Sequence, residues 1–289
     1  MTATTHVPAD QRPARMSREE MDALKSPDVN LYIAALLAGP ANVIMQMANT
    51  PVGRGVVESR VESGSLLKHP VKRTRTTLTY LAVAALGTAS DRKMYREAVN
   101  SAHRQVHSNN ESPVKYNAMD PKLQMWVAAC LYRGWEDITR LYGRPGEVNE
   151  QAYRQGAVMG TTLQMPYEMW PATREDFQRY WDETVESITE VDPGIREYLA
   201  KLMRLRFLGP YSGRAFTWIS EALTLGYLPE EFRDKLEWYP SPNQERFFDA
   251  NNVVLRIASR VTPQAIQVLP FKLLIADVRW RNRTGRPLI

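Results

Sequence analysis

The chain has 289 residues, of which 44% are hydrophobic and 24% are charged, and its formal net charge is +5. This length can bury a substantial core, and the composition is that of an ordinary globular protein. Lys and Arg are interleaved with Asp and Glu almost everywhere, so the charge indicates no clustered basic surface and excludes nucleic acid as an expected partner.

The cysteine content and the apolar runs indicate the cellular compartment of the protein. Cys130 is the single cysteine, which excludes an internal disulfide and a cysteine-built metal cluster. The first residues, "MTATTHVPADQRPARMSREEMD", lack the apolar run of a signal peptide. The longest apolar runs, "LYIAALLAG" and "LTYLAVAALG", are well short of the roughly 20 residues that a membrane span needs. We therefore expect a cytoplasmic protein without a membrane span.

Helix signals follow one another along nearly the whole chain. Residues 1–20 are polar and aperiodic, which predicts a mobile N-terminal arm. Beyond them, Asp followed by Pro at 120–121 and at 192–193 is typical of a helix start, and "TRED" from Thr173 resembles a capping box. Strand alternation and hairpin turns are absent from the sequence. The pattern predicts an all-α protein with a single multi-helix domain over residues 21–289.

The segment "KHPVKRTRTTLTYLAVAALGT" carries a basic cluster that leads directly into an apolar helix, expected over Val71–Leu86. In this helix Arg73, Thr77 and Tyr80 lie along one face. Basic and hydroxyl groups that lead into an apolar pocket suit an amphipathic ligand with carboxylates, such as haem with its propionates. The alternative is a helix N-terminus whose charges are only solvated.

Two of the four histidines fall at the end of a helix predicted to begin near Ser90. At about 100° per residue, His103 lies on the margin of its apolar stripe, and His107 lies about 40° further out. His103 can be a half-buried histidine that bonds a backbone carbonyl, or an axial ligand of haem iron. A zinc clamp by both histidines is a weak alternative, because an HExxH glutamate and a third ligand are missing.

The helix "LQMWVAACLYRGW" places Cys130 four residues after Trp126 on an apolar face. No basic residue lies within a turn on its N-terminal side. We expect an inert, buried thiol, and the alternative is a thiolate ligand of haem.

Several motifs occur in the order found in the MpaB and rubber oxygenase (latex clearing protein) catalytic domain family, and the chain resembles that family from about Leu37 to Val185. They read "GPANVIMQMANTPVGRGVVESRVES", "RTRTTLTYLAVAALGT", "HRQVHS", "YNAMDPKLQMWV" and "WPATREDFQRYW". A weaker likeness continues in "LGYLPEEFRDKL" and "LPFKLLIADVRWRNR".

The resemblance implies a haem b protein with a globin-related helical core around a haem pocket. It implies an oxygenase that cleaves carbon-carbon double bonds of isoprenoid chains with O2 and that draws electrons from a separate donor. The family's proximal histidine falls on His103, which would be the iron ligand. The distal arginine and threonine fall on Arg73 and Thr77, and a distal-side glutamate falls on Glu58.

One departure from the family pattern bears on function. Rubber oxygenases place a lysine immediately before the threonine, whereas this chain has Thr76. Taken together, the motifs predict a haem b-dependent oxygenase that acts on a small isoprenoid or lipid-like substrate. The alternative is a non-catalytic protein that binds or senses haem.

Overall fold

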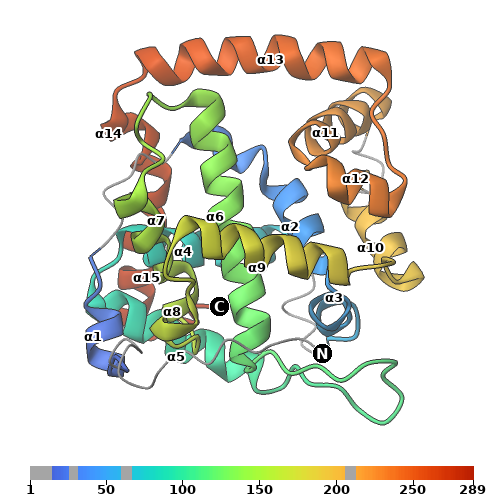
Figure 1. Ribbon diagram of the computed structural model, residues 1–289. Helices are drawn as coiled ribbons and strands as arrows, with labels where there is room; N and C mark the ends of the chain where they lie inside the picture. Colours follow the sequence, from blue (N-terminus) through green and yellow to red (C-terminus); the bar gives the residue numbers. More distant parts are fainter. Residues whose placement is uncertain (1–14, 26–31, 60–66, 206–212) are drawn as a thin grey trace.

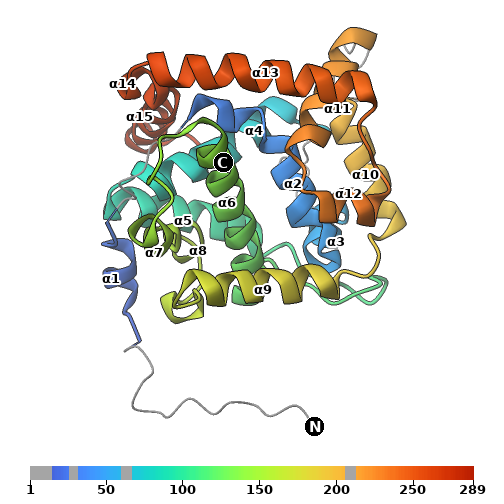
Figure 2. The same ribbon diagram turned by 45° about the horizontal axis from the view of Figure 1, so that its top comes forward.

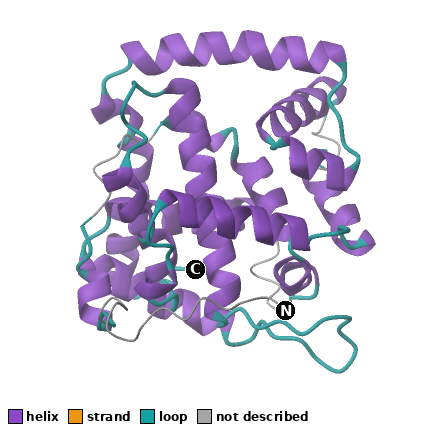
Figure 3. Cartoon of the chain, in the orientation of Figure 1, coloured by secondary structure: helices purple, strands orange, loops and turns teal. Residues whose placement is uncertain are grey.

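The computed structural model describes residues 15–25, 32–59, 67–205 and 213–289. Within these ranges the chain is helical and has no β-strand, as Figure 3 shows. The nearest approach to a sheet there is an isolated antiparallel bridge between His107 and Asn117. The prediction of an all-α protein is confirmed.

The helices in the first half of the chain are α1 (Arg18–Asp22), α2 (Gly39–Ala48), α3 (Thr50–Val57), α4 (Pro70–Leu86), α5 (Ala89–His103), α6 (Pro121–Tyr142), α7 (Glu150–Gly156) and α8 (Val158–Thr161). Those in the second half are α9 (Arg174–Ser187), α10 (Pro193–Met203), α11 (Arg214–Tyr227), α12 (Glu230–Leu236), α13 (Pro242–Val261), α14 (Gln264–Gln267) and α15 (Leu269–Arg283). Two short 3₁₀ turns are η2 (Ile33–Leu36) and η4 (Tyr167–Met169).

The helix starts expected from the sequence have the side-chain caps that it predicts. Asp120 accepts a hydrogen bond from the backbone of Lys122 at the start of α6. Asp192 caps α10 in the same way, and Thr173 caps α9. Each cap satisfies a backbone N–H that the first helical turn leaves without a partner.

Figures 1 and 2 show α6 running through the middle of the molecule, with α9 crossing it and α13 lying near its C-terminal end. Helix α4 packs against α5, α8 and α15. Helices α2, α3 and α10 form another group that packs together.

The main core lies where α6 and α9 cross, and it is rich in aromatic rings. Trp126 stacks on Trp181 with ring centroids 5.2 Å apart, and Tyr132 meets Phe177 edge to face at 5.0 Å. Such pairs stabilise a core beyond the area that they bury. A second cluster joins α4, α5 and α15 through Val83, Tyr95, Phe271, Ile275 and Val278.

The N-terminal helix α1 is fixed to the rest of the fold. Asp22 forms a bidentate ion pair with Arg96 of α5, and both side chains are buried. Arg18 donates two hydrogen bonds of 2.7 Å to the backbone carbonyls of Thr161 and Leu163. The mobile arm predicted for residues 1–20 is therefore too long at its C-terminal end, because its last three residues belong to α1. Residues 1–14 of the predicted arm lie outside the described residues.

None of the helices in the described ranges combines the length and the apolar character needed to cross a lipid bilayer.

Candidate functional site

Helix α4 carries three of the predicted site residues on one face, as its sequence indicates. Pro70 occupies its first turn, and the helix runs to Leu86, which confirms the expected bounds to within one residue. Arg73 lies in the first turns, and Thr77 follows one turn later and is half-buried. The apolar half of the helix is buried at Thr79, Ala82, Val83, Ala84 and Ala85. Packing of that half holds the polar first turns in place.

His103 is the last residue of α5 and is half-buried. Its Nδ1 atom is buried and has no hydrogen-bond partner within the described ranges. Burial, and then the nearby guanidinium of Arg73, lower the pKa of His103 to about 4. The imidazole is therefore neutral at pH 7 and keeps a nitrogen lone pair available.

Arg73 lies on α4 within electrostatic range of two other helices. Desolvation lowers its pKa, and Tyr198 of α10 and Tyr95 of α5 are close enough to interact electrostatically with it. The side chain nevertheless keeps much accessible surface. Among the described residues no carboxylate pairs with it, since neither an ion pair nor a hydrogen bond reaches its guanidinium. Its hydrogen-bond donors are therefore available to a ligand.

Tyr80 has its hydroxyl turned toward α8. The phenol donates a 2.5 Å hydrogen bond to the carbonyl oxygen of Met159, and burial raises its pKa. The structure therefore gives Tyr80 a definite partner within the protein. Its predicted role in cofactor binding stays a prediction.

Glu58 follows the last residue of α3, and its carboxylate accepts three hydrogen bonds. Ser112 and Tyr116 donate to it at 2.6 Å and 3.0 Å, and Arg54 donates at 3.4 Å. Arg54 also pairs with Asp192 at 2.5 Å, which connects α3 to the cap of α10. Glu58 thus anchors the loop that follows His103. The catalytic role predicted for Glu58 stays a prediction.

The expectation that His103 and His107 lie on the same helix is wrong. Helix α5 ends at His103, and His107 lies in the following loop, where it is exposed. The loop leaves the helical path because Val106 and Ser108 form backbone hydrogen bonds with Ala118 and Tyr116. A zinc clamp from one helix face is thereby excluded. Within the described ranges, no group of three or more His, Cys, Asp or Glu side chains could hold a metal ion.

Cys130 is fully buried in the core beside α2 and α9, and burial raises the pKa of its thiol. The predicted burial is confirmed. A neutral thiol inside an apolar core is a poor nucleophile and a poor metal ligand, which disfavours the thiolate alternative.

Two features of the site were not predicted. Tyr198 approaches Arg73 although the two residues are far apart in the sequence. Ser112 and Tyr116 bond Glu58 from a loop that lacks helical periodicity. Both depend on how the helices pack, and no local pattern near these residues indicates them.

Comparison with known proteins identifies the family of the chain. Residues 29–257 match the family described as "ER-bound oxygenase mpaB/B'/Rubber oxygenase, catalytic domain". Uncharacterised proteins from Mycobacterium bovis and Mycobacterium tuberculosis are each 46% identical to the chain over 259 residues, which covers 88% of this chain and 100% of theirs. No solved structure matches the chain. The globin-related core therefore stays a prediction.

Proposed function

The chain belongs to the mpaB and rubber oxygenase catalytic domain family, and we propose that it binds haem b through His103. We propose further that it uses O2 to cleave a carbon-carbon double bond in a small isoprenoid or lipid-like substrate. Membership of this family supports oxygenase activity. The haem, the substrate and a separate electron donor are parts of the proposal.

The observation that carries the proposal is a buried nitrogen of His103 that has no partner, with Arg73 nearby. The imidazole Nδ1 lacks a hydrogen-bond partner among the described residues, and a guanidinium without an ion pair lies within electrostatic range of the ring. Leaving a buried nitrogen without a partner destabilises the fold, unless a ligand completes it. Haem fits, because its iron takes a neutral imidazole.

The residues of the site have separable roles. When bound, haem would supply the iron chemistry that activates O2. His103 would hold the group and stay neutral at pH 7. Arg73 and Thr77 would donate hydrogen bonds to oxygen as it gains negative charge. Losing one such donor typically slows the chemical step about a hundredfold.

Absorption spectra of the purified protein test the haem ligand. We expect a Soret band that His103→Ala loses and His107→Ala keeps, because His107 is exposed in the loop. His107→Ala is the matched control, since it removes the same side chain four residues away. Full haem content in both variants would exclude His103 as the ligand.

Turnover tests the assignment of Arg73 and Thr77. We expect Arg73→Ala and Thr77→Ala to keep the Soret band and to turn over roughly a hundredfold more slowly. The assay mixes the reduced protein with O2 and a panel of terpenoids and detects cleaved carbonyl products. Bound haem without any product would instead favour the non-catalytic haem-binding alternative.

A further inference from the structure

The positive charge of the chain is concentrated at its C-terminal end. Residues 250–289 contain seven Lys and Arg but one acidic residue, Asp277, which gives +6. Since the whole chain carries +5, the residues before position 250 together carry −1. Asp277 is paired with Arg75 and Arg281, so it does not offset the exposed cations of this segment. Residues 250–289 therefore carry an excess of positive charge that the rest of the chain, summed, does not have.

The C-terminal half of helix α13 lies in this region and exposes an apolar stripe. Val253, Val254, Ile257 and Val261 expose 56%, 64%, 59% and 74% of their surface. At about 100° per residue these side chains fall within roughly 100° of one another around the helix. Figures 1 and 2 show α13 at the edge of the molecule in both views. Its buried side carries Gln244 and Asn252, so this helix turns its branched aliphatic side chains outward.

Exposed apolar residues continue along the chain beyond α13. Ile266 of α14 exposes 56% of its surface, and Leu269 and Leu273 of α15 expose 48% and 61%. Exposed basic residues accompany them, namely Arg256, Arg260, Lys272, Arg283 and Arg286. Within this set, the four aliphatic side chains of α13 share one face of the helix, with Arg260 near its margin, and such an exposed apolar stripe is typical of an interaction surface.

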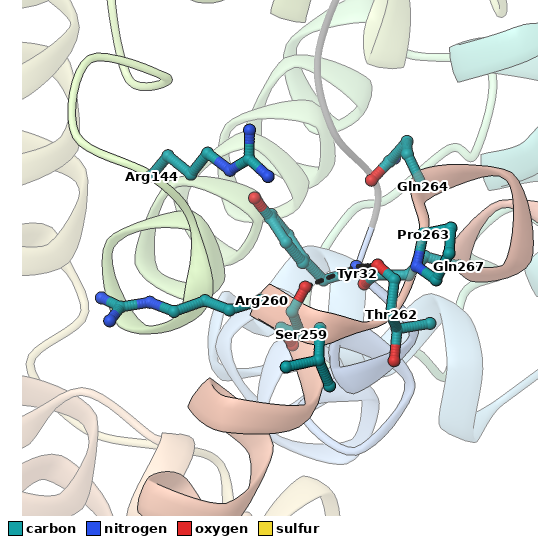
Figure 4. Close-up of a pocket in the computed structure, with 9 residues that line it drawn as sticks. Tyr32, Arg144, Ser259, Arg260, Thr262, Pro263, Gln264 and Gln267 are labelled. Atoms are coloured by element: carbon teal, nitrogen blue, oxygen red, sulfur yellow. Dashed lines mark hydrogen bonds between the residues drawn. The ribbon is translucent and has the colours of Figure 1, made fainter.

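A polar cleft of about 190 Å³ lies where α13 ends (Figure 4). Arg260 from α13 and Arg144 from the loop after α6 line it together with Thr262, Gln264 and Gln267. Neither arginine has an ion-pair partner within the described ranges. The carbonyl oxygen of the Gln267 side chain is buried without a hydrogen-bond partner. The cleft thus offers two cations next to the apolar stripe.

We propose that this region binds the surface of a membrane that contains anionic phospholipids. The stripe of α13 would enter the boundary between headgroups and acyl chains, as interfacial helices do. Arg144 and Arg260 would bind lipid phosphates. The proposal does not depend on haem or on the oxygenase reaction.

Charge decides between this partner and the alternatives. A second copy of the chain would bring the same basic segment against itself, and like charges repel across a symmetric interface. Nucleic acid would satisfy the cations but would leave the aliphatic stripe in water. An anionic lipid surface satisfies both parts, because phosphates take the cations and acyl chains take the aliphatic side chains.

Sedimentation with vesicles tests the proposal, comparing phosphatidylcholine alone with a mixture of phosphatidylcholine and phosphatidylglycerol. We expect binding to the anionic vesicles only, and weaker binding as salt rises. The double variant Val254→Asp/Ile257→Asp should bind at least about tenfold more weakly. Phe216→Asp is its matched control, because Phe216 is an exposed apolar residue of α11 with 54% of its surface exposed.

The cleft is tested with Arg144→Gln and Arg260→Gln. Each lost charge should weaken binding to anionic vesicles roughly fivefold, since one basic residue near such a surface contributes about 1 kcal/mol. The control is Arg179→Gln, which removes an exposed charge on α9 that already pairs with Asp176. Circular dichroism and thermal melts establish that every variant is folded.

Three results would overturn the proposal. The first is equal binding of the wild type to neutral and anionic vesicles, or no binding to either, which needs no variant. The second is a concentration-dependent dimer, seen by light scattering, that Val254→Asp/Ile257→Asp abolishes. The third is binding of a labelled oligonucleotide that depends on Arg144 and Arg260 but not on the stripe.

Discussion

Asp137 on α6 is a half-buried acid that has no ion-pair partner among the described residues. It lines a small pocket with apolar groups of α2 and with Tyr227 of α11. No hydrogen bond or ion pair reaches it from the described residues. Burial, with a smaller contribution from Glu136, raises its pKa from 3.8 to about 6 although nearby arginines oppose the shift. By contrast, Glu136 is bonded by three arginines, namely Arg133, Arg140 and Arg174.

The size of the effect follows from the two pKa values. A carboxyl that ionises at about 6 in the folded state and at 3.8 in the unfolded state costs up to about 3 kcal/mol of stability once it is charged. Between these values the folded state binds more protons, so the free energy of unfolding falls as pH rises from about 4 to about 6. Asparagine has nearly the same shape and carries no charge. Asp137→Asn should therefore stabilise the protein by up to about 3 kcal/mol at pH 7, with little difference at pH 4.

Urea denaturation of both proteins at a series of pH values measures this difference. Asp182→Asn is the matched control, because Asp182 is exposed on α9 and its replacement should change stability little. A stability difference between wild type and Asp137→Asn that stays constant from pH 4 to pH 8 would refute the reasoning. So would a variant that is less stable than wild type at pH 7.

Three further predictions concern packing and charge. Ion pairing with Arg279, helped by hydrogen bonds from Thr88, lowers the pKa of Asp91 to about 2. We expect Asp91→Asn to lose about 2 kcal/mol of stability above pH 4, and the loss to fade as pH falls through about 2, as denaturation would show. Gly226→Ala should destabilise the protein by about 1–3 kcal/mol, because the added Cβ would lie 2.3 Å from the ring of Phe248. Cys130 should react with a thiol reagent only as fast as the protein unfolds, which a denaturant series would show.

Controls separate these effects from general loss of structure. Gly39→Ala should be nearly neutral, since a Cβ there meets nothing within 4 Å. Arg279→Met should remove the same ion pair as Asp91→Asn and reproduce part of its loss. Rapid labelling of Cys130 without denaturant would contradict its burial in the core.

Local chemistry made the helix starts predictable. The caps at Asp120, Thr173 and Asp192 act within three residues, so their signal is complete in the sequence. The end of α5 was not predictable in this way. Its apolar stripe continues to Val106, but the backbone there bonds residues 116–118 and leaves the helix at His103. A long-range pairing thus overrode a local periodicity.

The candidate site was predictable only where its geometry depends on neighbouring residues in the sequence. The shared helix face of Arg73 and Thr77 follows from helical geometry alone. The approach of Tyr198 to Arg73 depends on packing across the fold and has no local signal. The net charge of the whole chain, +5, does not indicate a basic C-terminal segment. The segment becomes evident only when the charges of residues 250–289 are counted separately.

The interior arginines of the fold differ from Arg73. Arg96 pairs with Asp22, and Arg54 pairs with Asp192 and Glu58. Arg92 donates to three backbone carbonyls. Each of these guanidiniums is compensated by the protein itself. Arg73 has no ion pair or hydrogen bond among the described residues, keeps much of its surface exposed, and lies near a neutral imidazole. Its guanidinium is therefore available to donate hydrogen bonds to a ligand held beside His103.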